Sequence, residues 1–249
     1  MGKILKVKAM PADEKYVKDI VTDYDELSER CDEIDLTKKN TEIQDIILHL
    51  KNTIRAGSDI SGLSANQIGF KKRVICLNFD GDIRSFINPI ITSVDGFELS
   101  RETCHSIPGK TFIRPRNNKI KVTYMTPLAK IESVELMGKA AIVFQHHVDH
   151  LDGLLLNDVG LEIDDDFDNA TEQERIQIID MYLDSIDLNR QQIEADIESD
   201  PEAKKMSDGV RFIQSVQSGQ TKIEEIPWTE EEIKMFEEAK TKFDEKNKK

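Results

Sequence analysis

The sequence predicts an α+β fold, with strands and helices in separate stretches of the chain. Three observations predict it. An apolar repeat of helical period begins near Thr41, residues 60–136 contain short strand-like segments, and residues 139–151 have the pattern of a buried helix. Because the strands form one run between the helices, we expect helices packed on small sheets.

The first helix and four strands follow from apolar spacing and turn residues. The helix has apolar residues on one face and ends before the turn at Gly57; these residues are Ile43, Ile46, Ile47, Leu50 and Ile54. Strands are predicted at 73–77, 85–88, 119–124 and 131–136, where β-branched residues are frequent and several segments alternate with period two. Glycine and proline residues punctuate these segments and indicate turns between them.

The region after Gly160 predicts amphipathic helices. Thr171 and Glu174 form a candidate capping box, and another helix is predicted to start at Thr229. The acidic run 164–168 resembles a calcium loop, but Asn169 stands where that loop requires glycine, so we expect a solvated acidic turn. We therefore divide the chain into a body, residues 1–160, and an acidic helical extension, residues 161–249.

Charge and composition exclude several classes of protein. The net charge is -14, and nearly all of the excess acid lies in 161–249, which argues against binding to a nucleic-acid backbone. The acidic extension is either a solvated surface or a docking surface for a protein partner. No apolar run approaches the ~20 residues that a membrane helix needs, and the N-terminus does not resemble a signal peptide, so we expect a cytoplasmic protein that binds no membrane.

Cysteine and histidine residues suggest a metal site. Three cysteines are too few and too scattered for a disulfide scaffold, and Cys31 and Cys76 read as small buried apolar residues. His146 and His150 are four residues apart, which places both imidazoles on one face of a helix. This pair alone is only suggestive. Cys104, between predicted strands, would complete a tripod of the kind found in catalytic metal sites.

Three sequence blocks together resemble the peptide deformylase family. The family motifs G-Φ-G-Φ-A-A-x-Q, E-G-C-Φ-S and Q-H-E-x-D-H are matched in order by Ile60–Gln67, Glu102–Ser106 and Gln145–His150. The resemblance covers residues 3–160. It implies mixed β-sheets around a central metal-binding helix, to which this chain adds its C-terminal α-helical extension.

The resemblance also implies a site and a reaction. Cys104, His146 and His150 would bind one divalent ion, Fe²⁺ or Zn²⁺, which would activate water for removal of formate from a formyl-methionyl peptide. The oxyanion would be stabilised by Gln67 and the backbone N–H of His105, and substrate would run along Ile60, Gly62 and Leu63. A supporting charge network would hold the ligands and consists of Glu102, Arg116 and Asp149.

The chain departs from the family at the residue that transfers protons. His147 stands where the family has glutamate, and loss of a general acid–base group typically costs about 10²–10⁴ in rate. His147 would act as a base, act as a fourth metal ligand that closes the site, or have no catalytic role; His105 is a second candidate base. Other departures are Ile60 for glycine, Ser64 for alanine, Thr103 for glycine, His105 for an apolar residue and Thr111 for arginine.

Two functions therefore remain open from the sequence. The first is a deformylase-like metallohydrolase that uses a substituted base. The second is a catalytically inactive protein of the same fold with a structural or assembly role, for example within a phage particle, where it would be part of the virion. In the second function the extension would contact the partner through aromatic residues, which otherwise form an ordinary helix-packing core: Trp228, Phe236 and Phe243.

Overall fold

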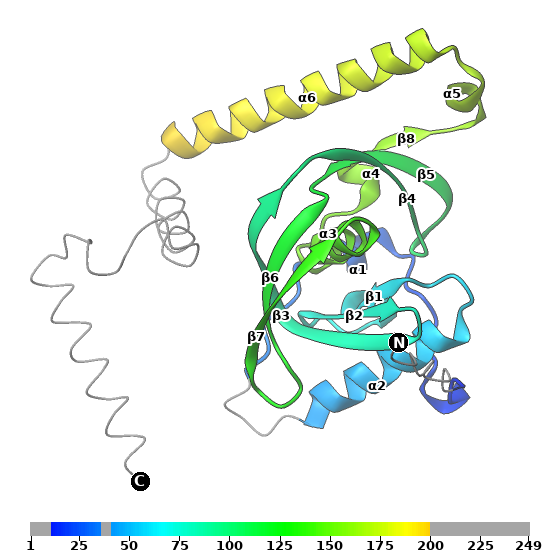
Figure 1. Ribbon diagram of the computed structural model, residues 1–249, viewed down its shortest axis with the longest axis vertical. Coiled ribbons are helices and arrows are strands. Elements are labelled where there is room, and N and C mark those ends of the chain that lie inside the picture. The colour runs from blue at the N-terminus through cyan, green and yellow to red at the C-terminus, as the bar shows by residue number, and fades with distance from the viewer. Residues whose placement is uncertain (1–10, 36–40, 200–249) are drawn as a thin grey trace, which may run out of the picture. The chain divides into compact units, whose positions relative to one another are not determined.

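The computed structural model describes residues 11–35 and 41–199 (Figure 1). The helix predicted from Thr229 and the aromatic residues Trp228, Phe236 and Phe243 lie outside the described residues. Residues up to Asn189 belong to one compact unit, and of the other unit only residues 190–199 are described. The predicted division after residue 160 stays a prediction.

The elements follow the predicted order of helix, strands and helices. The N-terminal half contains η1 (Glu14–Tyr16), α1 (Tyr24–Leu27), α2 (Thr41–Ala56), β1 (Gly62–Ser64), η2 (Ala65–Ile68), β2 (Val74–Phe79), β3 (Asp82–Asp95), β4 (Glu98–Cys104) and β5 (Ile107–Arg116). It is followed by β6 (Lys119–Met125), β7 (Ile131–Met137), α3 (Lys139–Leu151), α4 (Leu156–Val159), β8 (Leu161–Ile163), α5 (Asp165–Asn169) and α6 (Glu172–Ser199). The predicted α+β class is confirmed.

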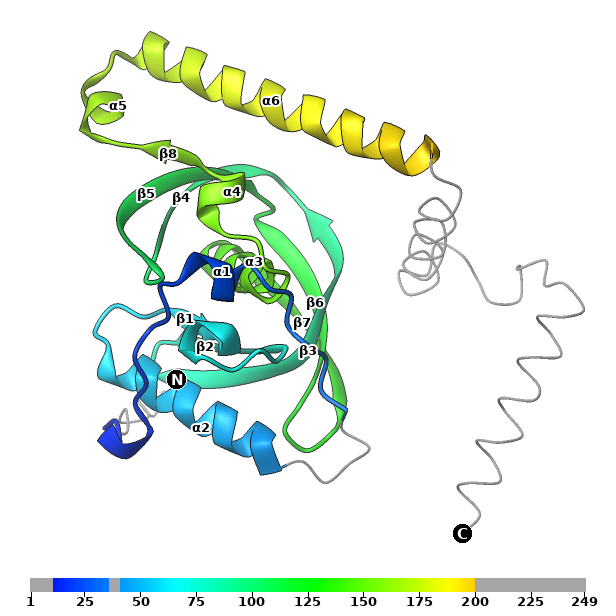
Figure 2. The same cartoon turned by 180° about the vertical axis from the view of Figure 1, so that it is seen from behind.

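Two sheets enclose the central helix α3. One has the strand order β1-β2-β3-β6-β7 and the other β4-β5-β8, and α3 lies between them in both views (Figures 1 and 2). Every ladder between these strands is antiparallel, whereas we expected mixed sheets. The reason is that β2–β3, β4–β5 and β6–β7 are joined by short turns, and a tight hairpin can only connect antiparallel strands.

Apolar packing determines the position of α3. Ala141, Phe144 and Leu151 are fully buried on this helix, and Phe144 meets Phe86 of β3 edge to face with ring centroids 5.1 Å apart. On the other side of the larger sheet, α2 buries its predicted apolar face against β1 and β2. Burial of these faces supplies most of the stability of such helices, so the fold holds α3 rigidly inside the body.

Strand β4 differs from the sequence prediction. We expected Cys104 in a segment between strands, but it is the last residue of β4, and Ile107 begins β5. The inward positions of β4 are Ser100, Glu102 and Cys104, while Leu99 is 39% exposed. Because polar residues occupy the buried face, the usual alternation of apolar residues is absent and the strand was not predicted.

The first residues of the predicted extension complete the smaller sheet. β8 pairs with β5, with Ile163 opposite Thr111. The acidic side chains of residues 164–168 are exposed as expected, but Asp164 caps the short helix α5 and residues 165–168 belong to it, where we predicted a turn. Thr171 and Glu174 form the predicted capping box, since the Thr171 N–H donates to Glu174 Oε2 at 2.8 Å and the Glu174 N–H donates to Thr171 Oγ1 at 3.3 Å. No helix among the described residues has the length and apolar character to span a membrane.

Candidate metal centre

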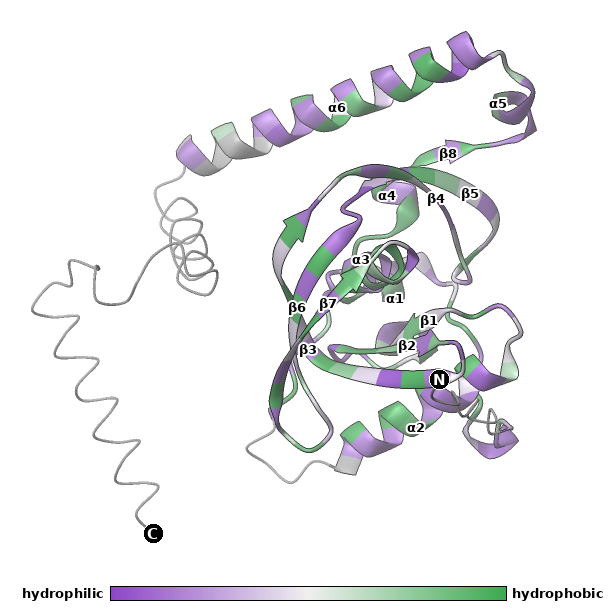
Figure 3. Ribbon diagram, in the orientation of Figure 1, coloured by the Kyte–Doolittle hydropathy of each residue, from purple (hydrophilic) through white to green (hydrophobic). Residues whose placement is uncertain are grey.

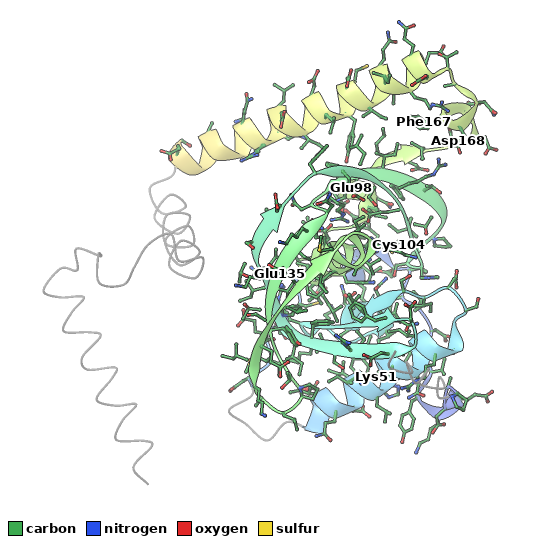
Figure 4. All side chains as sticks on the ribbon, viewed as in Figure 1. Lys51, Glu98, Cys104, Glu135, Phe167 and Asp168 are labelled. Carbon is green, nitrogen blue, oxygen red and sulfur yellow. The ribbon has the colours of Figure 1, made fainter. Side chains whose placement is uncertain are left out.

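Three donor side chains from two elements meet beside α3. His146 and His150 lie on one face of that helix, with ring centroids 4.9 Å apart. Cys104, labelled in Figure 4, is the last residue of β4. Cys104 Sγ lies 3.2 Å from His150 Nε2, and the three ligand atoms all lie within 4.8 Å of one another. This is the one such group of histidine, cysteine and acidic side chains found in the part of the chain that the structure describes.

The donor set fits a divalent metal ion. Sulfur and imidazole ligands bind Zn²⁺ at about 2.3 and 2.0–2.1 Å in a tetrahedral arrangement, which places the ligand atoms roughly 3.3–3.6 Å apart. The 3.2 Å between Cys104 Sγ and His150 Nε2 is close to this spacing. Three protein donors are typical of catalytic sites, whereas structural zinc sites usually have four. The chemistry of Cys104, His146 and His150 thus agrees with the predicted ligand set.

A buried charge network orients the first histidine. Glu102 Oε2 accepts a hydrogen bond from His146 Nδ1 at 2.9 Å. Arg116 donates to Glu102 from Nε at 2.7 Å and from Nη2 at 2.9 Å, and its Nη1 donates to Asp149 Oδ2 at 2.6 Å. The structure brings the predicted supporting residues together. Because Nδ1 of His146 is hydrogen-bonded to the Glu102 carboxylate, Nε2 is left to bind a metal ion. Carboxylates commonly orient metal-binding histidines in this way.

Burial and this network set the protonation of the site. Burial alone would raise the pKa of Glu102, but hydrogen bonds from His146 and Arg116 lower that pKa to about 2. Burial opposes charge on His146, whereas Cys104 and Glu102 together raise the pKa of His146 to about 9. Burial, and then repulsion from His146, lower the pKa values of His147 and His150 well below 6.5. Both imidazoles are therefore neutral, the form that binds metals and accepts protons.

Gln67 is held in one orientation beside Cys104. Its Oε1 accepts hydrogen bonds from the backbone N–H and the hydroxyl of Ser64, both at 3.1 Å. The amide Nε2 consequently points the other way, 3.2 Å from Ser106 Oγ and 3.7 Å from Cys104 Sγ. An amide flip would set Nε2 against the Ser64 backbone N–H, which can only donate, so Gln67 presents N–H groups next to the metal ligands. The sequence did not indicate that Ser64 and Ser106 orient Gln67.

A pocket of about 750 Å³ opens onto these groups. Its lining includes Gly62, Gln67, Cys104, His105 and His147. His105 is exposed to it. Of the other predicted substrate-binding residues, Ile60 lines a neighbouring pocket of about 590 Å³, and the Leu63 side chain packs in the core.

His147 lies in the pocket wall beside Gly62. A Cβ atom at position 62 would come within 2.5 Å of Leu77 Cδ2, 2.8 Å of His147 Nε2 and 3.0 Å of the Cys76 carbonyl oxygen, so a larger residue would displace these neighbours. The His147 ring stacks on His150 with centroids 6.1 Å apart and is 4% exposed. Its Nδ1 atom is buried and has no hydrogen-bond partner among the described residues. His147 is outside the three-donor group, and its ring is placed between that group and β1.

Comparisons with known proteins agree with this geometry. The model of the family described as Polypeptide deformylase matches residues 17–163. A peptide deformylase of Pelotomaculum thermopropionicum is 36% identical over 129 residues, which are 52% of this chain and 81% of the relative. The crystal structure of peptide deformylase from Thermotoga maritima has a TM-score of 0.53 and 30% identity, covering 57% of this chain and 97% of that one.

A phage protein is also similar in structure. The deformylase of Vibrio parahaemolyticus bacteriophage VP16T, solved in complex with actinonin, has a TM-score of 0.50 and 33% identity. The similarity covers 55% of this chain and 98% of that chain. The family match ends at Ile163, the last residue of β8, so α5 and α6 lie beyond it.

Proposed function

Since this chain belongs to the peptide deformylase family, we propose that it is a metal-dependent hydrolase that removes formate from the N-terminal formyl-methionine of new polypeptides in the cytoplasm. One observation carries the proposal. The donors Cys104, His146 and His150 meet at one point, and two of them, Cys104 and His146, line a pocket that Gln67 and His147 also line.

The metal centre would hold one divalent ion, Fe²⁺ or Zn²⁺. Such an ion polarises a carbonyl and lowers the pKa of a bound water, which is the chemistry that amide hydrolysis needs. His150 would bind it through a neutral nitrogen and His146 after release of its proton, and Glu102 would keep His146 in the required tautomer. The thiolate of Cys104 would complete the set.

The pocket residues would bind and orient the formyl amide. The Gln67 amide, directed toward Cys104 by Ser64, would donate to the carbonyl oxygen as negative charge develops there, together with the backbone N–H of His105. Gly62 would allow an extended peptide backbone to approach β1 closely, and a side chain at this position would displace His147.

His147 would perform the proton transfers assigned to glutamate by the motif resemblance. Three observations support this role: His147 lines the pocket, its lowered pKa keeps it neutral, and its Nδ1 has no partner among the described residues. The same lowered pKa disfavours the imidazolium that forms after proton abstraction, so the base is weak. We therefore expect a slower enzyme than one with glutamate at this position.

Formate release tests the proposal directly. The full chain is loaded with Fe²⁺ without oxygen and assayed on a formyl-methionyl peptide, alongside His147→Glu and His147→Ala. The wild type should be active, His147→Ala should lower kcat/KM by about 10²-fold or more, and His147→Glu should equal or exceed the wild type. A silent wild type with an active His147→Glu variant would refute His147 as the base.

A second candidate is an inactive deformylase-fold protein with an assembly role, for example in a phage particle. Exposed apolar side chains on α6 favour it: Ile176 is 51%, Met181 73% and Leu188 65% exposed. Such residues are suited to contact with a protein partner. The same assay separates the two functions, because this candidate requires a wild type that binds metal and releases no formate.

A further inference from the structure

A chain of hydrogen bonds and ion pairs joins α6 to the metal centre. Its outer end is the hydroxyl of Tyr182 on α6, which donates to the carbonyl oxygen of Val159 at 2.7 Å. Arg114 of β5 donates to the same oxygen from Nη1 at 2.9 Å. One carbonyl oxygen at the end of α4 thus connects the helix to a cation of the smaller sheet.

The connection continues inward from Arg114. Its Nη2 forms an ion pair with Asp149 Oδ2 at 3.2 Å, and the same oxygen accepts from Arg116 Nη1 at 2.6 Å. Arg116 donates two hydrogen bonds to Glu102, and Glu102 accepts a third from His146 Nδ1. Every step from α6 to a predicted metal ligand is therefore a direct contact between neighbouring groups.

Burial makes this network sensitive to the position of each member. The side chains of Arg116 and Glu102 are 3% and 6% exposed, and those of Arg114 and Asp149 are 18% and 19% exposed. Charges in such surroundings are weakly screened, so a displaced partner changes the field at the next one. Burial has the largest effect on the pKa of Tyr182 and raises it. Arg114, Arg116 and Glu102 also act electrostatically on the Tyr182 hydroxyl.

Arg114 depends on the Val159 carbonyl for its orientation. Its Nε atom is buried and has no hydrogen-bond partner within the described ranges. The guanidinium is consequently positioned by its Nη atoms alone, through Val159 and Asp149. Any shift of the Val159 carbonyl would move the Arg114 guanidinium and weaken its ion pair with Asp149.

The segment that carries Tyr182 is attached to the same sheet at a second point. Asp168 of α5, labelled in Figure 4, accepts hydrogen bonds from both Nη atoms of Arg101 at 3.0 and 2.6 Å. Arg101 precedes Glu102 on β4. Arg175, in the first turns of α6, donates to the Asp168 carbonyl oxygen at 3.2 Å. Residues beyond the family match thus contact the body at two points, Arg101 of β4 and the Val159 carbonyl oxygen.

We propose that Tyr182 is a positioning residue of the metal centre, which fixes the Val159 carbonyl and, through Arg114 and the Asp149–Arg116–Glu102 network, the orientation of His146. The inference rests on the proposed function only in that Cys104, His146 and His150 bind a metal ion. Residues that hydrogen-bond to metal ligands typically contribute about 10–100-fold to the affinity for the metal ion. Because Tyr182 acts through several contacts, we expect an effect of about three- to tenfold.

Co²⁺ binding by the full chain tests the proposal without requiring catalysis. Affinity is measured by competition with a chelator, and the visible d–d bands report ligand geometry. Tyr182→Phe removes only the hydroxyl and should weaken Co²⁺ binding by about three- to tenfold and shift the bands. Far-UV circular dichroism of Tyr182→Phe should match the wild type, which shows that α6 is still folded.

Two further variants calibrate the result. Tyr124→Phe is the matched control, because it removes a hydroxyl that meets Glu132 at 3.2 Å on the β6–β7 ladder, away from the network. Its Co²⁺ affinity and spectrum should equal those of the wild type. Glu102→Gln removes the acid that contacts His146 and should exceed Tyr182→Phe in effect.

The outcomes separate this inference from the proposed function. A Tyr182→Phe variant with the affinity and spectrum of the wild type would overturn the inference, since the hydroxyl would then serve only to dock α6. A wild type that binds no Co²⁺ overturns both this inference and the metal centre. A wild type that binds Co²⁺, responds to Tyr182→Phe and releases no formate refutes only the deformylase activity.

Discussion

The helices α3 and α6 are formed by different physical causes. Helix α3 has 13 residues, starts after Gly138 without a side-chain cap, and is buried by both sheets. Helix α6 has 28 residues, starts with the Thr171–Glu174 capping box, and mixes hydrophilic and hydrophobic residues along its length (Figure 3). Tertiary packing therefore determines α3, whereas local interactions at its start contribute much more to α6.

This difference agrees with the chemistry that each helix carries. Buried polar side chains are costly unless they are partnered, and α3 buries Gln145, His146, His147 and His150. A helix that presents metal ligands must be fixed in place, and the buried side chains of Ala141, Phe144 and Leu151 fix α3, while its residues His146 and His147 line the pocket. Helix α6 contributes a single hydroxyl at the edge of this arrangement, Tyr182.

Removal of a metal ligand from α3 should have the largest effect. His146→Ala should lower Co²⁺ affinity by more than the ~10–100-fold expected for loss of an outer partner. The exposed α6 residue Met181 provides the control, and Met181→Ala should leave the affinity unchanged. Chelator competition measures both. Retention of wild-type affinity within about tenfold by His146→Ala would exclude this histidine as a ligand.

Truncation of apolar residues should distinguish the two helices in stability. Phe144 of α3 is 0% exposed, and Phe144→Ala should lower the free energy of unfolding by about 3–5 kcal/mol through loss of burial and a residual cavity. Leu188 of α6 is 65% exposed, and Leu188→Ala should change it by less than about 0.5 kcal/mol. Guanidinium titrations of both variants measure this. A loss above about 1 kcal/mol for Leu188→Ala would mean that this face is packed.

Cysteine reactivity should report the burial around α3 as a function of pH. The Cys31 N–H donates to the Leu151 carbonyl oxygen at 2.9 Å, at the end of α3, and burial raises the pKa of Cys31 from 9.0 to about 11. Only the thiolate reacts. Alkylation of Cys31 at pH 8 should therefore be about 100-fold slower than in the unfolded chain, and its rate should still rise above pH 10. Peptide mass spectrometry after timed labelling gives the rate at each site.

The sign of the accompanying stability change follows from the same shift. The native state keeps the Cys31 proton to higher pH than the unfolded chain does, so this thiol lowers stability as pH rises from about 9 to 11 and has no such effect below pH 9. A cysteine introduced at exposed Ser185 of α6 should react at pH 8 at the unfolded rate. Equal rates at positions 31 and 185 would contradict the burial of α3.

Loss of the capping box should give the smallest effect and confine it to α6. Thr171→Ala removes the hydroxyl that pairs with Glu174, at a cost of about 1 kcal/mol, because the Glu174 N–H loses its acceptor and Glu174 Oε2 loses a donor. Amide hydrogen exchange in the first turn of α6 should accelerate about fivefold, while amides of α3 keep their protection. Equal acceleration in α3 would show that the two helices unfold together.

Strong apolar periodicity made parts of the fold predictable from the sequence. Helix α3 has the predicted bounds, and β6 and β7 extend the predicted strands 119–124 and 131–136 by one residue each. Strand β4 was missed because its inward side chains serve the charge network and the metal centre, and β5 was missed because Pro108 and Pro115 resemble turn residues. The functional requirement on this sheet thus hides its strands from pattern analysis.

The sequence by itself determined the pairing of His146 with His150, because residues four apart in a helix share a face whatever surrounds it. Its motifs also identified Cys104, Gln67 and the residues of the charge network. Only the tertiary structure decided that Cys104 reaches His150, that Gly62 faces His147, and that Tyr182 meets the carbonyl shared with Arg114. These contacts join residues far apart in the chain, and their distances depend on how the sheets and helices pack, which no local spacing encodes.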